Sequence, residues 1–266
     1  MTAILLDIDG VLHVSGEAVP GAPDAVRSLR DQGHRLRFVT NNTTRARSVL
    51  AGELQSIGFD LESEDITTTP LAAGKLLQGK RVLALVMSSI RDDLAEYVEL
   101  VEDGADAVLL GGADESEETA EVFSYGRLNQ AFAELREGAR LVCLHKNKWW
   151  QTSRGPLLDS GAFVAGLEYA TGVEATVLGK PSPSYFAAAL DALDAEPELT
   201  WLVTDDVDAD VRGARLFGMK TALVRTGKFR PEALESADTT PDIVVSSLAH
   251  FPALLEEDLT GGGWAP

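Results

Sequence analysis

Short apolar segments typical of strands alternate with amphipathic segments typical of helices along nearly the whole chain. The expected strands lie at 3–9, 35–41, 66–69, 176–178, 201–204, 221–225 and 243–246. The expected helices lie at 22–32, 44–57, 182–194, 208–217 and 248–256. This alternation favours a parallel sheet covered by helices, because parallel strands need long crossovers that are usually helical. We therefore expect an α/β fold.

The middle of the chain, residues 79–177, has a different character. It carries its own expected strands at 81–87, 107–110 and 140–145. A segment of roughly 100 residues has the size of a domain. We therefore expect one domain formed from both ends of the chain, residues 1–78 and 179–266, and an inserted α/β domain over residues 79–178.

The composition excludes several classes of partner. The chain has 266 residues and a net charge of −19, so nucleic acid and an anionic membrane surface would both repel it. A salt-rich environment and a simply acidic protein are equally compatible with this charge. Cys143 is the only cysteine, which argues against a disulfide framework and a cysteine zinc site. No apolar stretch reaches about 18 residues and no basic leader is evident, so we expect a cytoplasmic protein.

Asp7 and Asp9 follow the apolar run at 3–6, at the end of the first expected strand. Alternate residues of a strand point to the same face, so the two carboxylates lie on the same side. Neighbouring carboxylates repel each other unless a cation lies between them, and the oxygen-seeking ion Mg²⁺ suits such a pair. A solvated turn or a pair of helix caps is the alternative for this motif taken alone.

Thr40 and Asn41 end a second expected strand. The Thr40 hydroxyl can donate to a phosphate oxygen, and the Asn41 amide can position a substrate or a nucleophile. The alternative is an ordinary turn in which a following threonine caps the next helix.

Lys180 is held between a glycine and a proline in the segment Gly-Lys-Pro-Ser-Pro at 179–183. An ammonium group presented in this way can neutralise a phosphoryl group. The alternative is an exposed lysine at a proline-rich helix start. The glycine spacing of a phosphate-binding P-loop is absent before this lysine.

Four aspartates, Asp205, Asp206, Asp208 and Asp210, crowd the end of the strand expected at 201–204. Their mutual repulsion opposes folding, and a bound cation would reverse that balance. An acidic first turn of a helix accounts well for Asp208 and Asp210, but less well for Asp205. We therefore favour a metal-binding role for this cluster.

All four motifs lie at the expected carboxyl ends of strands, the edge at which open parallel sheets bind ligands. Together they supply a nucleophile, an acid–base group, a hydroxyl, an ammonium and an acidic metal site. This set is complete for transferring a phosphoryl group to a carboxylate.

The order of the motifs resembles that of the haloacid dehalogenase superfamily of phosphatases. The long segment between Thr40 and Lys180 resembles subfamily IIA, the NagD-like and p-nitrophenyl phosphatases, which carry a large α/β cap of C2 type there. Segments 123–125, 177–183 and 224–231 look most like the phospholysine phosphohistidine inorganic pyrophosphate phosphatase group. The resemblance covers nearly the whole chain. It implies a Rossmann-like core with a parallel sheet, an inserted cap, and Mg²⁺-dependent hydrolysis of a small phosphate ester through an aspartyl-phosphate.

The resemblance also implies a role for each motif residue. Asp7 matches the nucleophile, and Asp9 matches the acid that protonates the leaving oxygen and later activates water. The Mg²⁺ ligands would be the carboxylates of Asp7 and Asp205 and the main-chain carbonyl of Asp9. Thr40 and Lys180 would bind the phosphate, and Asn41 would contact the substrate. Asp210 and Asp206 would stabilise the metal ligands without binding the metal themselves.

Two residues depart from the pattern of this family. Thr204 stands where the family usually has glycine before the metal-binding aspartate, which would crowd the loop. Asp9 is an acid where the phospholysine phosphohistidine group carries serine. An acid at this position should strengthen phosphomonoester hydrolysis. It also weakens the inference that this chain acts on the exact substrates of that group.

Two other functions stay open as alternatives: a non-catalytic phospho-receiver module, and a dehalogenase of small 2-haloacids, against which Asp9 argues.

The expected partner is a small-molecule phosphate ester, with no nucleic acid and no membrane, and related proteins suggest a homodimer formed through the cap. Residues 146–150 of the cap would either contact the substrate or simply pack. Among the histidines, His13 is expected nearest to the site.

Overall fold

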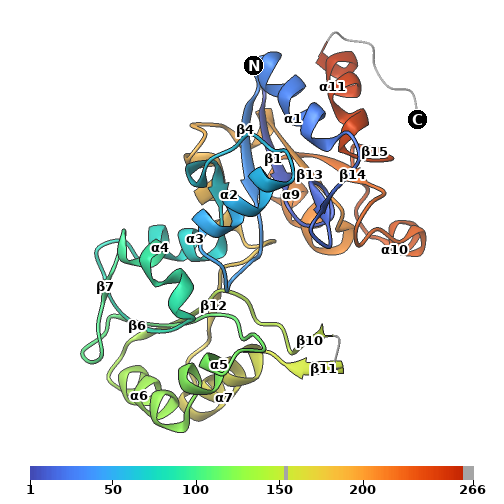
Figure 1. Cartoon of the computed structure of the whole chain (residues 1–266). Helices are drawn as coiled ribbons and strands as arrows, with labels where there is room; N and C mark the ends of the chain where they lie inside the picture. Colours follow the sequence, from blue (N-terminus) through green and yellow to red (C-terminus); the bar gives the residue numbers. More distant parts are fainter. Residues whose placement is uncertain (153–154, 260–266) are drawn as a thin grey trace. The chain divides into compact units, whose positions relative to one another are not determined.

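The structure is a computed structural model that describes residues 1–152 and 155–259, and it divides into two compact units (Figure 1). Unit 1 comprises Met1–Thr40, Ser48–Thr67 and the chain from Phe186 onward. Unit 2 comprises Asn41–Arg47 and Thr68–Tyr185. Unit 1 therefore contains both ends of the described chain, while the division predicted after residues 78 and 178 stays a prediction.

Unit 1 is built on a six-stranded parallel sheet in the order β15-β14-β13-β1-β4-β5. Its strands are β1 (Ala3–Asp7), β4 (Arg35–Val39), β5 (Ile66–Thr67), β13 (Thr200–Thr204), β14 (Lys220–Val224) and β15 (Ile243–Val245). A short antiparallel hairpin, β2 (His13–Val14) and β3 (Glu17–Ala18), follows β1. The helices that lie wholly or mostly in this unit are α1 (Ala22–Asp31), α2 (Arg47–Ser56), α8 (Pro183–Asp191), α9 (Arg212–Leu216), α10 (Pro231–Ser236) and α11 (Phe251–Leu259). Shorter helical turns lie at Ser63–Asp65, Pro197–Leu199, Val207–Val211 and Leu248–His250.

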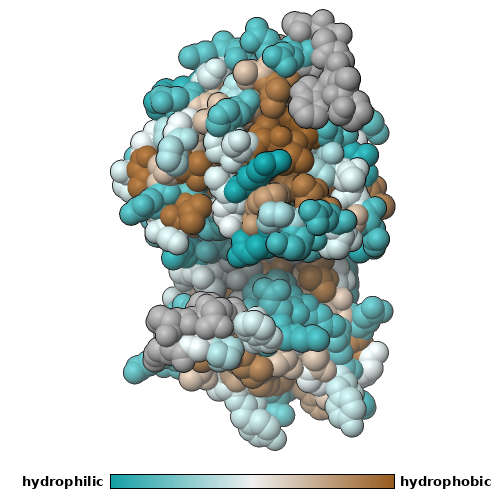
Figure 2. Space-filling view, turned by 90° about the vertical axis from the view of Figure 1, so that its right-hand side faces the viewer, coloured by the Kyte–Doolittle hydropathy of each residue, from teal (hydrophilic) through white to brown (hydrophobic). Residues whose placement is uncertain are grey.

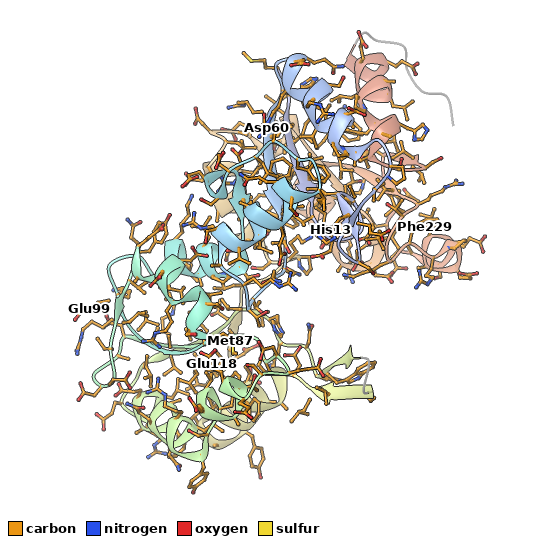
Figure 3. The ribbon with its side chains drawn as sticks, in the orientation of Figure 1. His13, Asp60, Met87, Glu99, Glu118 and Phe229 are labelled. Atoms are coloured by element: carbon orange, nitrogen blue, oxygen red, sulfur yellow. The ribbon has the colours of Figure 1, made fainter. Side chains whose placement is uncertain are left out.

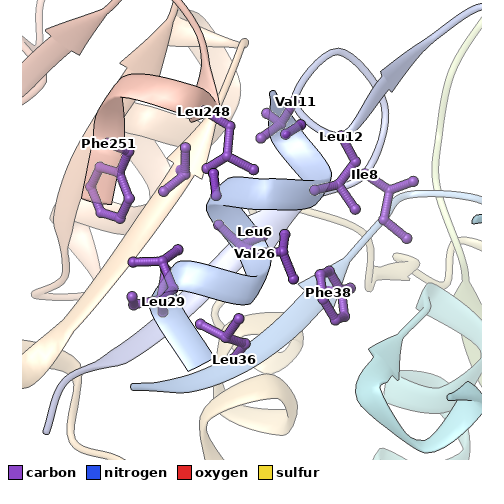
Figure 4. Packing of buried hydrophobic residues seen from close by; sticks show 14 of the residues in the cluster. Leu6, Ile8, Val11, Leu12, Val26, Leu29, Leu36, Phe38, Leu248 and Phe251 are labelled. Carbon is purple, nitrogen blue, oxygen red and sulfur yellow. The ribbon is translucent and has the colours of Figure 1, made fainter. Parts of the chain in front are cut away.

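Helix α1 shows how the sequence builds this unit. A proline in its first turn and apolar residues at Ala22, Val26 and Leu29 give it one buried face. Figure 4 shows this face packed beside Leu6 of β1 and Phe38 of β4, in a core cluster of buried residues. Alternate residues of the strands point to the opposite face of the sheet, which is also buried.

Unit 2 contains a five-stranded parallel sheet in the order β12-β9-β8-β6-β7. Its strands are β6 (Arg81–Leu85), β7 (Glu99–Leu100), β8 (Ala107–Leu110), β9 (Arg140–Cys143) and β12 (Thr176–Val177). An antiparallel hairpin joins β10 (Trp149–Thr152) to β11 (Gly155–Leu158). Its helical segments are α3 (Thr69–Leu76), Ser88–Ile90, α4 (Arg91–Ala95), α5 (Glu118–Val122), α6 (Tyr125–Arg136) and α7 (Gly161–Thr171).

The strands of unit 2 are buried on both faces. Val82 and Leu109 belong to one core cluster, whereas their sequence neighbours Leu83 and Val108 belong to another. This alternation is expected for a parallel sheet with helices on both sides. The predicted α/β fold, with a parallel core sheet and a second α/β unit inserted in the chain, is confirmed.

Several local features differ from the expected elements, among them the hairpin of β2 and β3 and the short strand β7. Residues 208–217 do not form one regular helix, because a π-helical turn at Val207–Val211 precedes α9. The hairpin of β10 and β11 was not among the expected strands. In the part of the chain that the structure describes, no helix has the length and apolar character needed to span a bilayer. Hydrophilic side chains cover much of the face in Figure 2, interrupted by hydrophobic patches.

Candidate active site

The strand order of unit 1 brings the sequence motifs of this unit to one edge of the sheet. Strand β1 lies between β13 and β4, with Leu6 opposite Val203 and Asp7 opposite Val39. All three strands are parallel, so the residues that end or follow them meet at the same edge. Asp7, Thr40 and Asp205 are therefore neighbours at the carboxyl ends of adjacent strands, as the sequence predicted.

Three carboxylates are buried at this edge. Asp7 is 6% exposed, Asp205 is 2% exposed and Asp210 is 3% exposed. Burying like charges together is costly unless hydrogen bonds or a cation compensate them. One oxygen of Asp7 accepts a hydrogen bond from the backbone N–H of Ile8 at 2.9 Å. The arrangement therefore favours a cation at this edge.

The Thr204 hydroxyl links two of these acids. It lies 2.9 Å from Asp210 Oδ2 and 3.4 Å from Asp7 Oδ2, and it accepts the backbone N–H of Asp206 at 3.2 Å. A hydroxyl carries one hydrogen, so the shorter contact makes Asp210 the better acceptor. Thr204, which departs from the family pattern, is thus accommodated as a hydrogen-bonding residue.

Asp9 differs from Asp7 because its side chain is 64% exposed. The Thr40 hydroxyl donates to Asp9 Oδ2 at 3.4 Å. The ring of His13, labelled in Figure 3, places Nε2 at 3.7 Å from Asp9 Oδ1. Asp9 is therefore the member of the pair that can exchange protons with solvent and with a ligand.

A loop between β14 and α10 closes around Asp205. The Thr226 hydroxyl donates to the Gly10 carbonyl, and the backbone N–H of Lys228 donates to Asp205 Oδ2 at 2.6 Å. Gly10 and Gly227 both have positive φ, and a Cβ on either would come within 1.9 and 2.1 Å, respectively, of Asp205 Oδ2. Only glycine fits at these two positions. Sequence reasoning assigned no role to this loop beyond its resemblance to the family.

Asp206 and Asp210 have different surroundings. Asp206 Oδ1 accepts the backbone N–H of Ala209 at 3.0 Å and so caps the π-helical turn. The Lys228 ammonium lies 4.0 Å from its other oxygen. Asp210, by contrast, is buried and bonded to Thr204. Asp210, which an acidic first turn of a helix would also have explained, therefore belongs to the buried acidic group, while Asp206 caps the turn.

Asn41 and Lys180 lie together in unit 2. Asn41 Oδ1 accepts the backbone N–H of Lys180 at 2.7 Å, and Asn41 Nδ2 donates to the Lys180 carbonyl at 3.0 Å. Lys180 is 8% exposed and precedes a cis proline. The Asn41 amide thus fixes the backbone of the lysine, a role that sequence reasoning did not assign to it.

The remaining candidates in the inserted unit are less distinctive. Trp149 is 59% exposed, and the side chain of Trp150 lies outside the described residues. Burial raises the pKa of the Cys143 thiol to about 12, so this cysteine stays protonated and unreactive at neutral pH. Cys143 is therefore a core residue, as expected.

These features define an α/β enzyme with paired aspartates at a strand end and an inserted second unit. Residues 4–99 match the haloacid dehalogenase-like hydrolase family, and residues 177–251 match a second HAD-hydrolase-like family. The chain is 37% identical over 262 residues to phospholysine phosphohistidine inorganic pyrophosphate phosphatase of Xenopus laevis, covering 95% of this chain and 94% of that protein. The chain belongs to the haloacid dehalogenase-like hydrolases.

Solved structures of phosphatases share the fold. The 4-nitrophenylphosphatase of Thermotoga maritima superposes with a TM-score of 0.84 at 25% identity, covering 95% of this chain and 97% of that one. The glycerol phosphate phosphatase of Mycobacterium tuberculosis, in complex with magnesium, gives a TM-score of 0.79 at 28% identity, covering 93% of this chain and 75% of that one. The predicted family and the predicted class, a hydrolase of the phosphatase branch, are confirmed.

Proposed function

We propose that this chain is a Mg²⁺-dependent phosphatase that hydrolyses a small phosphate monoester through an aspartyl-phosphate on Asp7. The observation that carries this proposal is the contrast between the two aspartates of the first motif. Asp7 is buried beside other acids, whereas the Asp9 side chain is 64% exposed. Asp7 is suited to act as an ionised nucleophile in a fixed position, and Asp9 is suited to exchange protons.

The chemistry divides between these two carboxyl groups. A carboxylate oxygen of Asp7 attacks phosphorus while the bond from phosphorus to the ester oxygen breaks, and Asp9 gives its proton to the departing oxygen. Asp9, now ionised, takes a proton from water, and the hydroxide attacks phosphorus and releases phosphate from Asp7. Asp9 thereby recovers its proton for the next cycle. The Thr40 hydroxyl, 3.4 Å from Asp9 Oδ2, supports the orientation of this acid.

The residues present fit a Mg²⁺ ion. The donors would be the carboxylates of Asp7 and Asp205 and the main-chain carbonyl of Asp9, all oxygen atoms, which are the ligands that this ion prefers. Among the described residues no group of three acidic, histidine or cysteine side chains is arranged to hold a metal ion, and the proposed set accordingly includes a main-chain oxygen. The glycines that abut Asp205 support this fit, because they leave its carboxylate held tightly in place. Mg²⁺ supplies neutralising charge for the transferred phosphoryl group.

The phosphate clamp is assigned to Thr40, Asn41 and Lys180. The Lys180 ammonium would neutralise charge on the phosphoryl oxygens as a compact cation. Asn41 contributes through its two hydrogen bonds to the Lys180 backbone. Asp210, joined to Thr204, supports the metal ligands from behind, and Asp206 does so through the turn that it caps.

The partner in this proposal is a small phosphorylated metabolite. The net charge of −19 continues to disfavour nucleic acid and anionic membranes. A homodimer formed through the inserted unit and a cytoplasmic location stay predictions.

The test uses Asp7→Asn, which keeps the shape of the side chain and removes the nucleophilic charge. The variant should keep the melting temperature of the parent protein and lose Mg²⁺-dependent hydrolysis of p-nitrophenyl phosphate. Asp60→Asn is the matched control, because the Asp60 side chain is 89% exposed and makes only a 3.9 Å ion pair (Figure 3). Retained Mg²⁺-dependent turnover in Asp7→Asn would refute the assignment of the nucleophile.

A further inference from the structure

Unit 2 contains a cavity of about 570 Å³ at Asn41 and Lys180, two residues of the proposed phosphate clamp. It is lined by Asn41, Lys180 and Ser182 and by the loop that carries His145, Lys146 and Asn147. A cavity of this size accepts a small metabolite. Because Lys180 lines it, the proposed function implies that this cavity receives the part of the substrate that leaves with the ester oxygen.

The Lys146 ammonium, which would attract an anionic ligand, is already compensated. Its Nζ lies 2.8 and 2.6 Å from the two carboxylate oxygens of Glu168. Glu168 also accepts the backbone N–H of Ala175 at 3.0 Å. The hydrogen bonds from Lys146 and from this backbone N–H lower the pKa of the Glu168 carboxyl below its ordinary value, so Glu168 is ionised at neutral pH. Lys146 and Glu168 together bring no net charge to the cavity.

The second cationic candidate, His145, also has its own counter-charge. Its Nε2 lies 3.6 Å from Asp159 Oδ1, and its Nδ1 accepts the backbone N–H of Asn147 at 3.3 Å. The hydrogen atom is thereby assigned to Nε2, facing Asp159. Burial lowers the pKa of His145, and the Asp159 carboxylate opposes this effect. In either protonation state, the pair adds no positive charge for a ligand to use.

The loop that carries these residues is pinned to the start of α7. The backbone N–H of Gly161 donates to the Asn147 carbonyl at 3.1 Å, and the N–H of Asp159 donates to the Lys148 carbonyl at 3.1 Å. A Cβ at Gly161 would lie 2.3 Å from the Asn147 carbonyl oxygen, so the two backbones are in close contact. These contacts fix the backbone of the loop on either side of the pair that Lys146 forms with Glu168.

We propose that this cavity selects an uncharged, polar leaving group, such as a polyol, over a leaving group that carries a carboxylate or a second phosphate. A second anion would lose its hydration without gaining a counter-charge from the loop, since the two loop cations that line the cavity, Lys146 and His145, already lie beside Glu168 and Asp159. A hydroxylated leaving group would instead be met by amide and hydroxyl groups, those of Asn147 and Ser182 among them. This inference rests on the proposed function and names the substrate class of that site.

The experiment compares glycerol 3-phosphate with 3-phosphoglycerate, which share a three-carbon skeleton but differ in one carboxylate. With p-nitrophenyl phosphate as the reference, kcat/KM should favour glycerol 3-phosphate by about tenfold or more. Glu168→Gln removes the counter-charge of Lys146 and can still accept the Ala175 N–H. This variant should shift the ratio toward 3-phosphoglycerate by about tenfold, mainly through KM.

Glu137→Gln, an equal change of charge on an exposed residue of the same unit, should leave the ratio unchanged. A wild-type preference for 3-phosphoglycerate, or an unchanged ratio in Glu168→Gln, would overturn the inference. Turnover of p-nitrophenyl phosphate without turnover of either three-carbon ester would overturn it as well. If none of the three esters is hydrolysed, the proposed function itself fails, so the two failures are distinguishable.

Discussion

The Asn41 side-chain amide and the Lys180 backbone are joined by two hydrogen bonds, although the two residues are 139 positions apart in the chain. The amide oxygen accepts at 2.7 Å and the amide nitrogen donates at 3.0 Å, so both polar ends of the side chain are used. Lys180 is 8% exposed, and the Asn41 side chain bonds to both its backbone N–H and its backbone carbonyl. Asn41 follows Thr40 directly, so the sequence places a proposed phosphate ligand next to the residue that fixes the lysine.

Asn41→Ala should lower kcat/KM for p-nitrophenyl phosphate by about 10- to 100-fold, because loss of the two hydrogen bonds releases the Lys180 backbone. Asn42→Ala is the matched control. The Asn42 amide oxygen accepts the local N–H groups of Thr44 and Arg45, so its loss should affect the turn and leave kcat/KM nearly unchanged. Equal kcat/KM values for Asn41→Ala and the parent protein would show that Lys180 does not depend on this amide.

Gly227→Ala should abolish most of the stabilisation that Mg²⁺ confers. A Cβ at this position would lie 2.1 Å from Asp205 Oδ2 and 2.5 Å from the Gly10 Cα, so the proposed ligand would have to move. The measurement is the rise in melting temperature on adding Mg²⁺, since a ligand that binds the folded state stabilises it.

Gly16→Ala is the control for Gly227→Ala. Gly16 has φ +84°, close to the +61° of Gly227, and no atom within 4 Å of the added Cβ. Both variants bear a backbone cost of about 1–2 kcal/mol, so the clash with Asp205 is the difference between them. A full Mg²⁺ response in Gly227→Ala would mean that Asp205 does not bind the ion.

Residues at the ends of neighbouring strands could be predicted from the sequence. Apolar runs locate β1, β4 and β13, and parallel strands carry whatever follows them to one edge. This rule alone is enough to predict that Asp7, Thr40 and Asp205 lie at the same edge of the sheet. The buried and exposed members of the Asp7 and Asp9 pair could not be told apart, because alternation assigns both to the same face.

Contacts made by loops could not be predicted. The Thr226 hydroxyl meets the Gly10 carbonyl across 216 positions, and no periodicity in the sequence specifies how two turns pack. The Asn41 amide was expected to contact the substrate, but the direction of a side chain after a strand end depends on the loop that it meets. The compensation of Lys146 by Glu168 escaped prediction for the same reason, because it depends on how the loop after β9 meets helix α7.

Thr204→Val should destabilise the protein by about 1–3 kcal/mol, because it keeps the shape of the side chain while removing the hydroxyl. The Asp210 carboxylate, 2.9 Å from that hydroxyl, would lose a buried hydrogen bond, and the backbone N–H of Asp206 would lose a partly buried one. Thr204→Ser keeps the hydroxyl and should lie close to the parent protein. Urea unfolding measures the difference, and identical free energies of unfolding for the valine variant and the parent protein would contradict it.

The pH dependence of stability should be visible at Asp242, which ties β15 to β14. Its Oδ2 accepts the backbone N–H of Thr221 at 2.8 Å and the Thr221 hydroxyl at 3.0 Å, and its Oδ1 lies 2.6 Å from the Arg215 guanidinium. Burial alone would raise the pKa of Asp242, but the bonds from Arg215 and Thr221 outweigh it, and the pKa lies below its ordinary value of 3.8. The folded state therefore holds fewer protons than the unfolded state in the window between these two values.

It follows that Asp242 stabilises the fold fully above pH 3.8, and that this contribution is lost as the pH falls through the folded-state pKa. Asp242→Asn removes the titrating group but keeps an acceptor for Thr221. The difference in free energy of unfolding between the parent protein and this variant should be constant near pH 7 and should shrink on acidification below pH 4. Other carboxyls with lowered pKa values, such as Asp114, titrate equally in both proteins and cancel in the difference. A difference that grows on acidification would reverse the sign of the effect and show that the ionised Asp242 does not stabilise the sheet.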